Sequence, residues 1–101
     1  MHPDDLEDVI DGMLWRTDTA TLLCGDDFWD GRNYERDGRN TWLFRTPHSR
    51  YFLQEQSRRP GEARAKITPV SVAEAVARWG TLPQRHCTFE TAFPGVTPTE
   101  A

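Results

Sequence analysis

The sequence lacks a long hydrophobic run, so we expect no membrane-spanning helix. Its first residues also lack the basic-then-apolar pattern of a signal peptide, and we therefore expect a cytoplasmic protein with no membrane partner. It has only two cysteines, Cys24 and Cys87, which are too few for a disulfide framework. Without a secretion signal we expect both thiols to be reduced and buried. The sequence leaves open whether a disulfide joins them.

Positive charge is scarce in the first third of the chain. Residues 1–30 contain nine carboxylates and a single basic side chain, Arg16. Residues 31–66 reverse this balance, with nine basic side chains and four acidic ones. The two segments either pair with each other inside one fold or form an acidic and a basic surface that attract different partners.

Length and composition indicate one small globular domain. The 101 residues are 37% hydrophobic and 11% aromatic, which is enough for a compact core. We predict an α+β fold in which an antiparallel meander of four or five strands is covered on one face by a helix. The predicted segments of this domain, 1–101, are an acidic N-terminal helix over 1–13, a β-meander over 14–68, a helix over 69–80 and an irregular tail over 81–101.

The segment 40–56 predicts a central β-hairpin, because two aromatic and β-branched runs flank the polar residues 47–49. If Thr46 pairs with Tyr51, four large side chains share one face of the hairpin. This predicted core face consists of Trp42, Phe44, Tyr51 and Leu53. The opposite face, with Leu43, Arg45, Phe52 and Gln54, is expected to be partly exposed or to meet a partner.

The N-terminal segment has apolar residues at helical spacing. Leu6, Val9, Ile10 and Met13 fall at i, i+3, i+4 and i+7, after a Pro and several carboxylates that suit the first turn of a helix. Next, residues 16–24 are rich in β-branched side chains and predict a strand. A short helix that begins at Asp18 or Thr19 is the alternative there.

Residues 30–40 contain the tetrapeptide Asp-Gly-Arg-Asn twice, seven residues apart. Asp-Gly is a strong signal for a type I′ turn, because both central residues need a positive φ. The second copy predicts a turn at Asp37-Gly38, with Arg36 opposite Arg39 and Tyr34 opposite Thr41. A short strand would then join the central hairpin and extend the meander.

The C-terminal third contains a predicted edge strand and a capped helix. Lys66, Ile67 and Thr68 form the expected strand, which Pro69 ends. Ser71 and Glu74 form a capping box for a helix over 71–79, with Gly80 just after its end and a stripe of Val72, Val76 and Trp79 facing the sheet. In the tail that follows, Phe89 and Phe93 are expected to pack against the core.

No catalytic or metal-binding motif is evident. Asp26, Asp27, Asp30 and Asp37 lack the alternating ligand spacing of a calcium loop, and the histidines and cysteines lack that of a zinc site. We expect no cofactor and no metal. The one candidate for acid–base chemistry is His48, beside Arg45 and Arg50, in a small nuclease or hydrolase.

Two sets of residues are candidates for binding a partner. The acidic set is Asp4, Asp5, Glu7, Asp8, Asp26, Asp27 and Asp30. The basic and aromatic set is Arg32, Arg36, Arg39, Arg45 and Phe52. Side chains of the second type bind phosphates and bases, and they also dominate protein interfaces. A pI near 5.3 favours a protein partner. Exposure of Trp29, Trp42 and Phe52 would identify the binding face.

Three segments, residues 16–22, 43–53 and 67–75, resemble a loose group of short bacterial proteins that phages and plasmids often carry. The resemblance rests on the order of residue types in the hairpin and on the sequence Ile-Thr-Pro-Val-Ser before the predicted helix. It implies a sheet-plus-helix fold and no active site. Our first hypothesis is a non-catalytic, anti-CRISPR-like inhibitor or accessory protein that binds a host protein or protein–nucleic acid complex. The alternatives are a nucleic-acid-binding protein that uses its arginines and the nuclease centred on His48.

Overall fold

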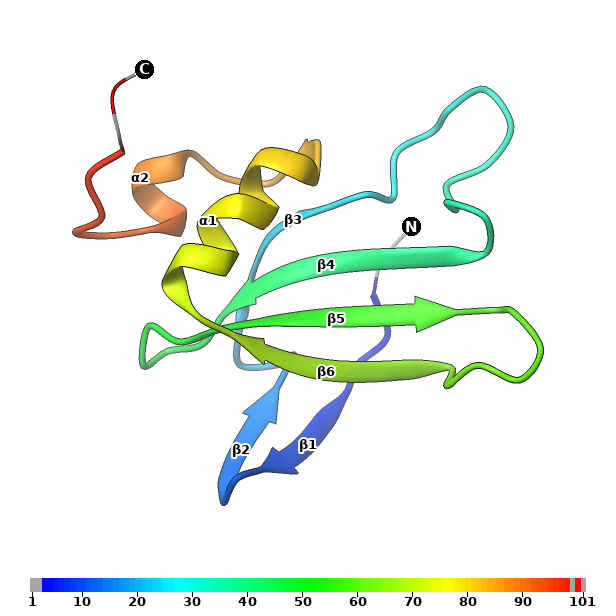
Figure 1. Cartoon of the computed structure of the whole chain (residues 1–101), viewed down its shortest axis with the longest axis horizontal. Coiled ribbons are helices and arrows are strands. Elements are labelled where there is room, and N and C mark those ends of the chain that lie inside the picture. Colours follow the sequence, from blue (N-terminus) through cyan, green and yellow to red (C-terminus); the bar gives the residue numbers. More distant parts are fainter. Residues whose placement is uncertain (1–2, 99, 101) are drawn as a thin grey trace.

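The computed structural model describes residues 3–98 and 100, and its main element is a five-stranded antiparallel sheet (Figure 1). The strand order is β6-β5-β4-β3-β7, so neighbours in the sheet are neighbours in the chain except for β7. The strands are β3 (Thr21–Gly25), β4 (Arg39–Arg45), β5 (Tyr51–Ser57), β6 (Ala65–Val70) and β7 (Gln84–Arg85). With the helix α1 (Val72–Thr81), this single-domain α+β architecture confirms the predicted fold class.

The N-terminal segment is a β-hairpin, so the predicted acidic helix over 1–13 is wrong. β1 (Glu7–Ile10) pairs with β2 (Met13–Arg16) across a two-residue turn. Asp11 and Gly12 take φ values of 51° and 75°, as a type I′ turn requires. The turn therefore prevails over the helical spacing of the apolar residues, and it places Val9 opposite Leu14.

The predicted strand over 16–24 is correct only from Thr21 onward, because residues 17–20 form a turn. β2 ends at Arg16, and a tight turn follows in which the backbone N–H of Ala20 donates to the carbonyl of Thr17 at 3.3 Å. β3 then begins at Thr21 and contains a bulge between Leu22 and Cys24. This break separates the N-terminal hairpin (Glu7–Arg16) from the main sheet.

The central hairpin forms as predicted, but its register is one residue off. Arg45, not Thr46, pairs with Tyr51, and Phe44 consequently pairs with Phe52. A slip of one residue exchanges the faces of one strand relative to the other. Trp42 and Phe44 therefore share a face with Phe52, whereas Leu43 shares the other face with Tyr51 and Leu53. Both faces of the hairpin are buried, so the expected exposure of Leu43, Phe52 and Gln54 is wrong.

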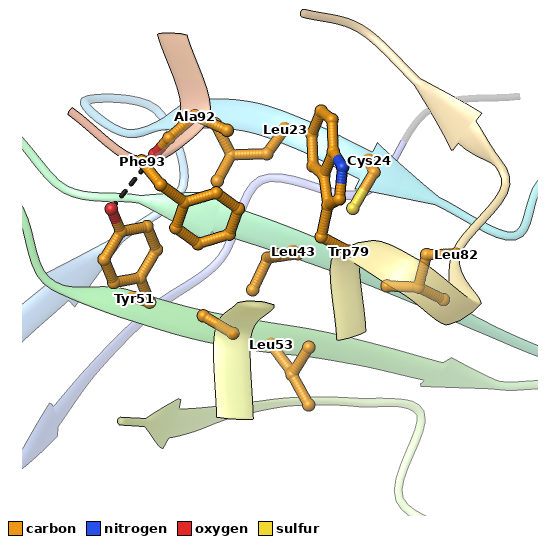
Figure 2. Close-up of a cluster of buried hydrophobic side chains, with 10 residues drawn as sticks. Leu23, Cys24, Leu43, Tyr51, Leu53, Trp79, Leu82, Ala92 and Phe93 are labelled. Carbon is orange, nitrogen blue, oxygen red and sulfur yellow. Dashed lines mark hydrogen bonds between the residues drawn. The ribbon is translucent and has the colours of Figure 1, made fainter. Parts of the chain in front are cut away.

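Each face of the main sheet carries its own hydrophobic cluster. One cluster lies beneath α1 and α2 (Phe89–Ala92), and Figure 2 shows most of its side chains. The other lies against the N-terminal hairpin, where Trp15 meets Phe52 edge to face at 5.9 Å. Its buried members are Trp15, Trp42, Phe44, Phe52 and Ile67. The sheet is thus a middle layer between the helices and the hairpin.

The helix α1 begins where the sequence predicts. The Ser71 hydroxyl accepts a hydrogen bond from the backbone N–H of Glu74, which confirms the cap. The helix continues through Gly80 to Thr81, so the prediction that it ends at Trp79, with Gly80 just after its end, is wrong. Ala75 and Trp79 are buried, whereas Val72 is exposed and does not belong to the packed stripe.

The segment after α1 is more ordered than the irregular tail that we predicted. It adds β7 to the edge of β3, and then α2, which Thr88 caps. Phe93 is 1% exposed and stacks on Tyr51 at 5.1 Å, which confirms that it packs against the core. The Tyr51 hydroxyl donates to the Ala92 carbonyl at 3.0 Å (Figure 2). Long-range contacts from the central hairpin therefore order this segment.

The edge strand β6 extends one residue past Pro69, to Val70. Pro69 is opposite Phe52 on the edge strand, where a residue without an N–H is tolerated because none of the described strands pairs with the outer side of β6. No helix in the described part of the chain is both long enough and apolar enough to cross a membrane.

Candidate protein-binding surface

The connection between β3 and β4, residues 26–38, is a long loop that projects from one end of the sheet (Figure 1). Its first residue anchors it to β4. Asp26 Oδ1 accepts hydrogen bonds from the backbone N–H of Thr41 at 2.9 Å and from Asn40 Nδ2 at 3.1 Å. Its last residues form the predicted turn at Asp37-Gly38, with φ values of 53° and 77° and a bridge between Arg36 and Arg39. The predicted pairing of Tyr34 with Thr41 does not form, because Thr41 pairs with β5 and Asp26.

Internal hydrogen bonds hold the tip of this loop. Asp30 Oδ1 accepts from the backbone N–H groups of Arg32 and Asn33 at 2.8 and 3.0 Å, and these donors lower the pKa of the Asp30 carboxyl. The Arg36 guanidinium lies 4.1 Å above the Phe28 ring and donates to the carbonyls of Phe28 and Asn33. The first Asp-Gly-Arg-Asn copy thus forms a cap inside the loop, and the second forms its closing turn.

The loop presents two aromatic side chains to solvent. Trp29 is 57% exposed and Tyr34 is 44% exposed, and their ring centroids are 5.2 Å apart at an angle of 53°. We call Trp29 and Tyr34 the aromatic pair. The sequence marked Trp29 as a side chain whose exposure matters, but it did not identify Tyr34 as a site residue. The signal that could have found Tyr34 is its position between the two Asp-Gly turns.

The structure disperses the basic and aromatic candidates. Phe52 is completely buried, so its assignment to a partner-binding surface is wrong. Arg45 donates to the carbonyls of Thr91 and Ala92 and holds α2 in place. Arg36 is bound within the loop, and Arg39 binds the Glu62 carboxylate. Arg32 is exposed at the tip of the loop, close in sequence to both members of the aromatic pair.

The acidic candidates fall into two groups. Asp4, Asp5, Glu7 and Asp8 are exposed and lie on or just before β1. The other three are Asp26, Asp27 and Asp30, which belong to the β3–β4 loop; Asp26 and Asp30 hold backbone N–H groups there, and Asp27 is buried. The single acidic surface expected from the sequence therefore reduces to the N-terminal hairpin and the residues that precede it.

A groove of about 550 Å³ lies at the base of the loop, where its end meets the connection between β5 and β6. Its charged lining is balanced, with Asp4, Glu35 and Glu62 facing Arg58, Arg59 and Arg64. Arg58 pairs with Glu35 at 2.7 Å, and Arg59 Nε donates to the Asp37 carbonyl at 2.6 Å. Much of the positive charge in the 31–66 segment is therefore used inside the fold.

Glu62 lies in the connection between β5 and β6 and links it to Arg39 and Ser57. Its charge makes the stability of the fold depend on pH. It accepts hydrogen bonds from Arg39 Nε at 3.0 Å and from the Ser57 hydroxyl at 2.9 Å, which lower the pKa of its carboxyl to about 2. Because the pKa is lower in the folded state, this stabilisation is complete above the unfolded pKa near 4.5 and is lost as the pH falls towards 2.

We expect Glu62→Gln to flatten the fall in urea midpoint between pH 5 and pH 2.5. The measurement is urea unfolding at both pH values, with Glu90→Gln as an exposed control that should keep the wild-type slope. Equal slopes for Glu62→Gln and the wild type would contradict the assigned role of Glu62.

The structure does not support the nuclease alternative centred on His48, because both arginines expected beside it make other contacts. His48 is exposed in the β4–β5 turn. Of the two arginines expected beside it, Arg45 is committed to α2, and Arg50 donates to the Met13 sulfur at 3.4 Å. Burial raises the pKa of the Cys24 thiol to about 12, which opposes its use as a nucleophile. Within the described residues, no three His, Cys, Asp or Glu side chains come together as a metal site.

Comparisons of the chain with protein-family models, curated proteins and solved structures give no match.

Proposed function

We propose that the chain is a non-catalytic protein-binding module and that the aromatic pair of the β3–β4 loop is the centre of its interface. The observation that carries this proposal is the exposure of Trp29 and Tyr34, at 57% and 44%, on a loop that is otherwise fastened to itself and to β4. Trp, Tyr and Arg dominate the binding energy of protein interfaces, and Arg32 lies between the two rings in sequence.

The internal bonds of the loop also support binding. An interface residue that is already held in place loses less conformational freedom when the complex forms. The Asp30 cap, the Arg36 guanidinium and the Asp26 anchor each restrain the backbone on which the two rings are mounted. The aromatic pair therefore offers apolar area at a low entropic cost.

Nucleic acid is the second candidate, because exposed aromatic rings can also stack on bases. Such binding needs free cationic side chains beside the rings. Of the four candidate arginines, Arg32 is exposed beside the rings, whereas Arg36, Arg39 and Arg45 donate to internal carbonyls or to Glu62. The groove at the base of the loop has a balanced charge. These contacts favour a protein partner.

The partner class that we propose is a host macromolecular complex, on which the chain acts as an inhibitor or accessory protein. The resemblance to proteins carried by phages and plasmids supports this choice, and bacterial lysate is therefore the first source in which to seek the partner.

We expect Trp29→Ala to weaken capture of the partner by about 30-fold, which corresponds to about 2 kcal/mol, as for a central hot-spot residue. The measurement is quantitative pull-down from bacterial lysate with tagged wild type, Trp29→Ala and Tyr34→Ala. Val72→Ala is the matched control, because Val72 is an apolar side chain with similar exposure on α1.

Since Trp29 is mostly exposed, its substitution should change the free energy of unfolding by no more than about 0.5 kcal/mol. Loss of capture without loss of stability supports the proposed interface. Equal capture by the wild type and both loop variants would refute it.

A further inference from the structure

The N-terminal hairpin carries a second surface, independent of the aromatic pair, on the outer side of β1. The backbone N–H of Thr17 donates to the Leu6 carbonyl at 3.0 Å, so these residues form a hydrogen-bonded pair next to the hairpin. Bonded and non-bonded pairs alternate along an antiparallel ladder. Glu7 and Val9 therefore direct their backbone N–H and C=O groups away from β2, and no strand in the described ranges pairs with that side.

The same hairpin exposes an apolar pair on the face turned away from the core. Val9 and Leu14 are directly opposite each other and are 65% and 57% exposed. Trp15, on the other face, is buried against Phe52. An open strand edge beside an exposed apolar pair has the two features that strand addition uses, namely backbone bonds for affinity and a side-chain contact for specificity.

Charge identifies the kind of segment that fits this edge. Asp5, Glu7 and Asp8 flank it, and the one basic side chain of the hairpin, Arg16, already pairs with Glu7 at 3.5 Å and with Asp18 at 2.6 Å. Two copies of β1 placed edge to edge would set carboxylates against each other, which is destabilising. The edge therefore favours a cationic strand.

We propose that the open edge of β1 binds an extended, positively charged segment of a partner protein by strand addition, with an apolar residue of that segment covering Val9 and Leu14. This surface belongs to the N-terminal hairpin, which projects from the sheet in a different direction from the β3–β4 loop (Figure 1). Variants of the aromatic pair therefore leave it intact.

The test uses a seven-residue peptide of alternating Lys and Val, with an alternating Glu and Val peptide of the same length as the charge-reversed control, titrated into the full-length chain and followed by NMR. We expect saturable binding of the Lys peptide below about 1 mM, the range of weak peptide recognition. The backbone amides of Glu7 and Val9 should gain protection from hydrogen exchange. The Glu peptide should not bind.

Two variants test separately the backbone groups of the β1 edge and the carboxylates that flank it. Val9→Pro removes an outward N–H without removing a bond to β2, and it should weaken the Lys peptide at least about tenfold. Because a proline could disturb the hairpin, the double change Asp5→Asn with Asp8→Asn is the second variant, and it should weaken binding roughly threefold or more as two attractive charges are lost. Glu90→Gln, on α2, should have no effect.

Four results of the peptide titrations would overturn the proposal, and a fifth concerns the chain alone. These are the absence of saturable binding by the Lys peptide, equal binding of the two peptides, protection at β6 in place of β1, and binding unchanged by the Asp5 and Asp8 double substitution. A concentration-dependent rise in the mass of the chain, lost in Val9→Pro, would also overturn it, because the occupant of the edge would then be a second copy.

Discussion

Phe52→Ala is expected to lower the free energy of unfolding by about 3–5 kcal/mol, far more than an exposed side chain of this fold should cost. Phe52 is completely buried, lies 5.0 Å from Phe44 in a stacked arrangement and meets the Trp15 ring edge to face. Its removal leaves a cavity between the main sheet and the N-terminal hairpin. Urea unfolding at 25 °C measures the loss.

The Phe52 prediction separates the structure from the sequence-based hypothesis that this ring contacts a partner. A partner contact would make Phe52→Ala reduce binding with almost unchanged stability, as we expect for Trp29→Ala. If Phe52→Ala leaves too little folded protein to measure, Phe52→Leu preserves most of the volume and should still cost more than about 1 kcal/mol. A stability equal to that of the wild type in both variants would contradict the burial of Phe52.

Gly25→Ala is expected to destabilise the fold by about 3 kcal/mol, at the upper end of the usual cost of overpacking. A Cβ at Gly25 would lie 2.4 Å from Trp42 Cδ1 and 2.9 Å from its Nε1. Trp42 is completely buried within the second hydrophobic cluster, so its indole ring has no free space into which it can turn. Either the ring or β3 must shift.

Gly80→Ala provides the matched control for Gly25→Ala. Gly80 is inside α1, and a Cβ there meets no atom within 4 Å. Alanine should therefore stabilise the helix by about 0.5–1 kcal/mol relative to glycine. Opposite signs for the two substitutions, measured by urea unfolding, are the expected result. Destabilisation by Gly80→Ala, or no change in Gly25→Ala, would contradict the packing around these two residues.

Local signals were reliable where a few adjacent residues determine the conformation. Asp37-Gly38 makes the predicted turn, and Ser71 caps α1, because each depends on the conformation and hydrogen bonds of its own segment. The N-terminal helix failed although the same signal was present. Asp11-Gly12 also makes a type I′ turn, and it prevailed over the helical spacing of the apolar residues.

The register of the central hairpin could not be predicted from its composition. Ser49 takes a φ of 59° in the β4–β5 turn, a conformation that a serine in the sequence does not indicate. The turn therefore contains one residue more than expected. That residue moves Phe52 to the face of Trp42 and changes it from a candidate interface residue to a core residue. Arg45 was likewise misassigned, because its partners, the carbonyls of Thr91 and Ala92, are more than forty residues away.

The candidate surface was only partly accessible to sequence reasoning. The exposure of Trp29 depends on the loop that the two Asp-Gly turns build, whereas the burial of Trp42 depends on the N-terminal hairpin that covers it. Trp29 lies between Phe28 and Asp30 in a stretch rich in carboxylates, and Trp42 begins the run Trp42-Leu43-Phe44 that the sequence placed in the core. The apolar run therefore indicated the burial of Trp42, whereas the exposure of Trp29 became evident only from the tertiary packing.

The most direct test of the central claim, that this chain binds protein through the aromatic pair, is a pull-down from bacterial lysate with and without nuclease treatment, using the wild type and a Trp29→Ala, Tyr34→Ala double variant. We predict that a defined set of proteins is captured equally in both lysates by the wild type and is lost with the double variant. Recovery of nucleic acid alone, or of proteins that disappear after nuclease treatment, would contradict the claim and favour an arginine-based nucleic-acid surface.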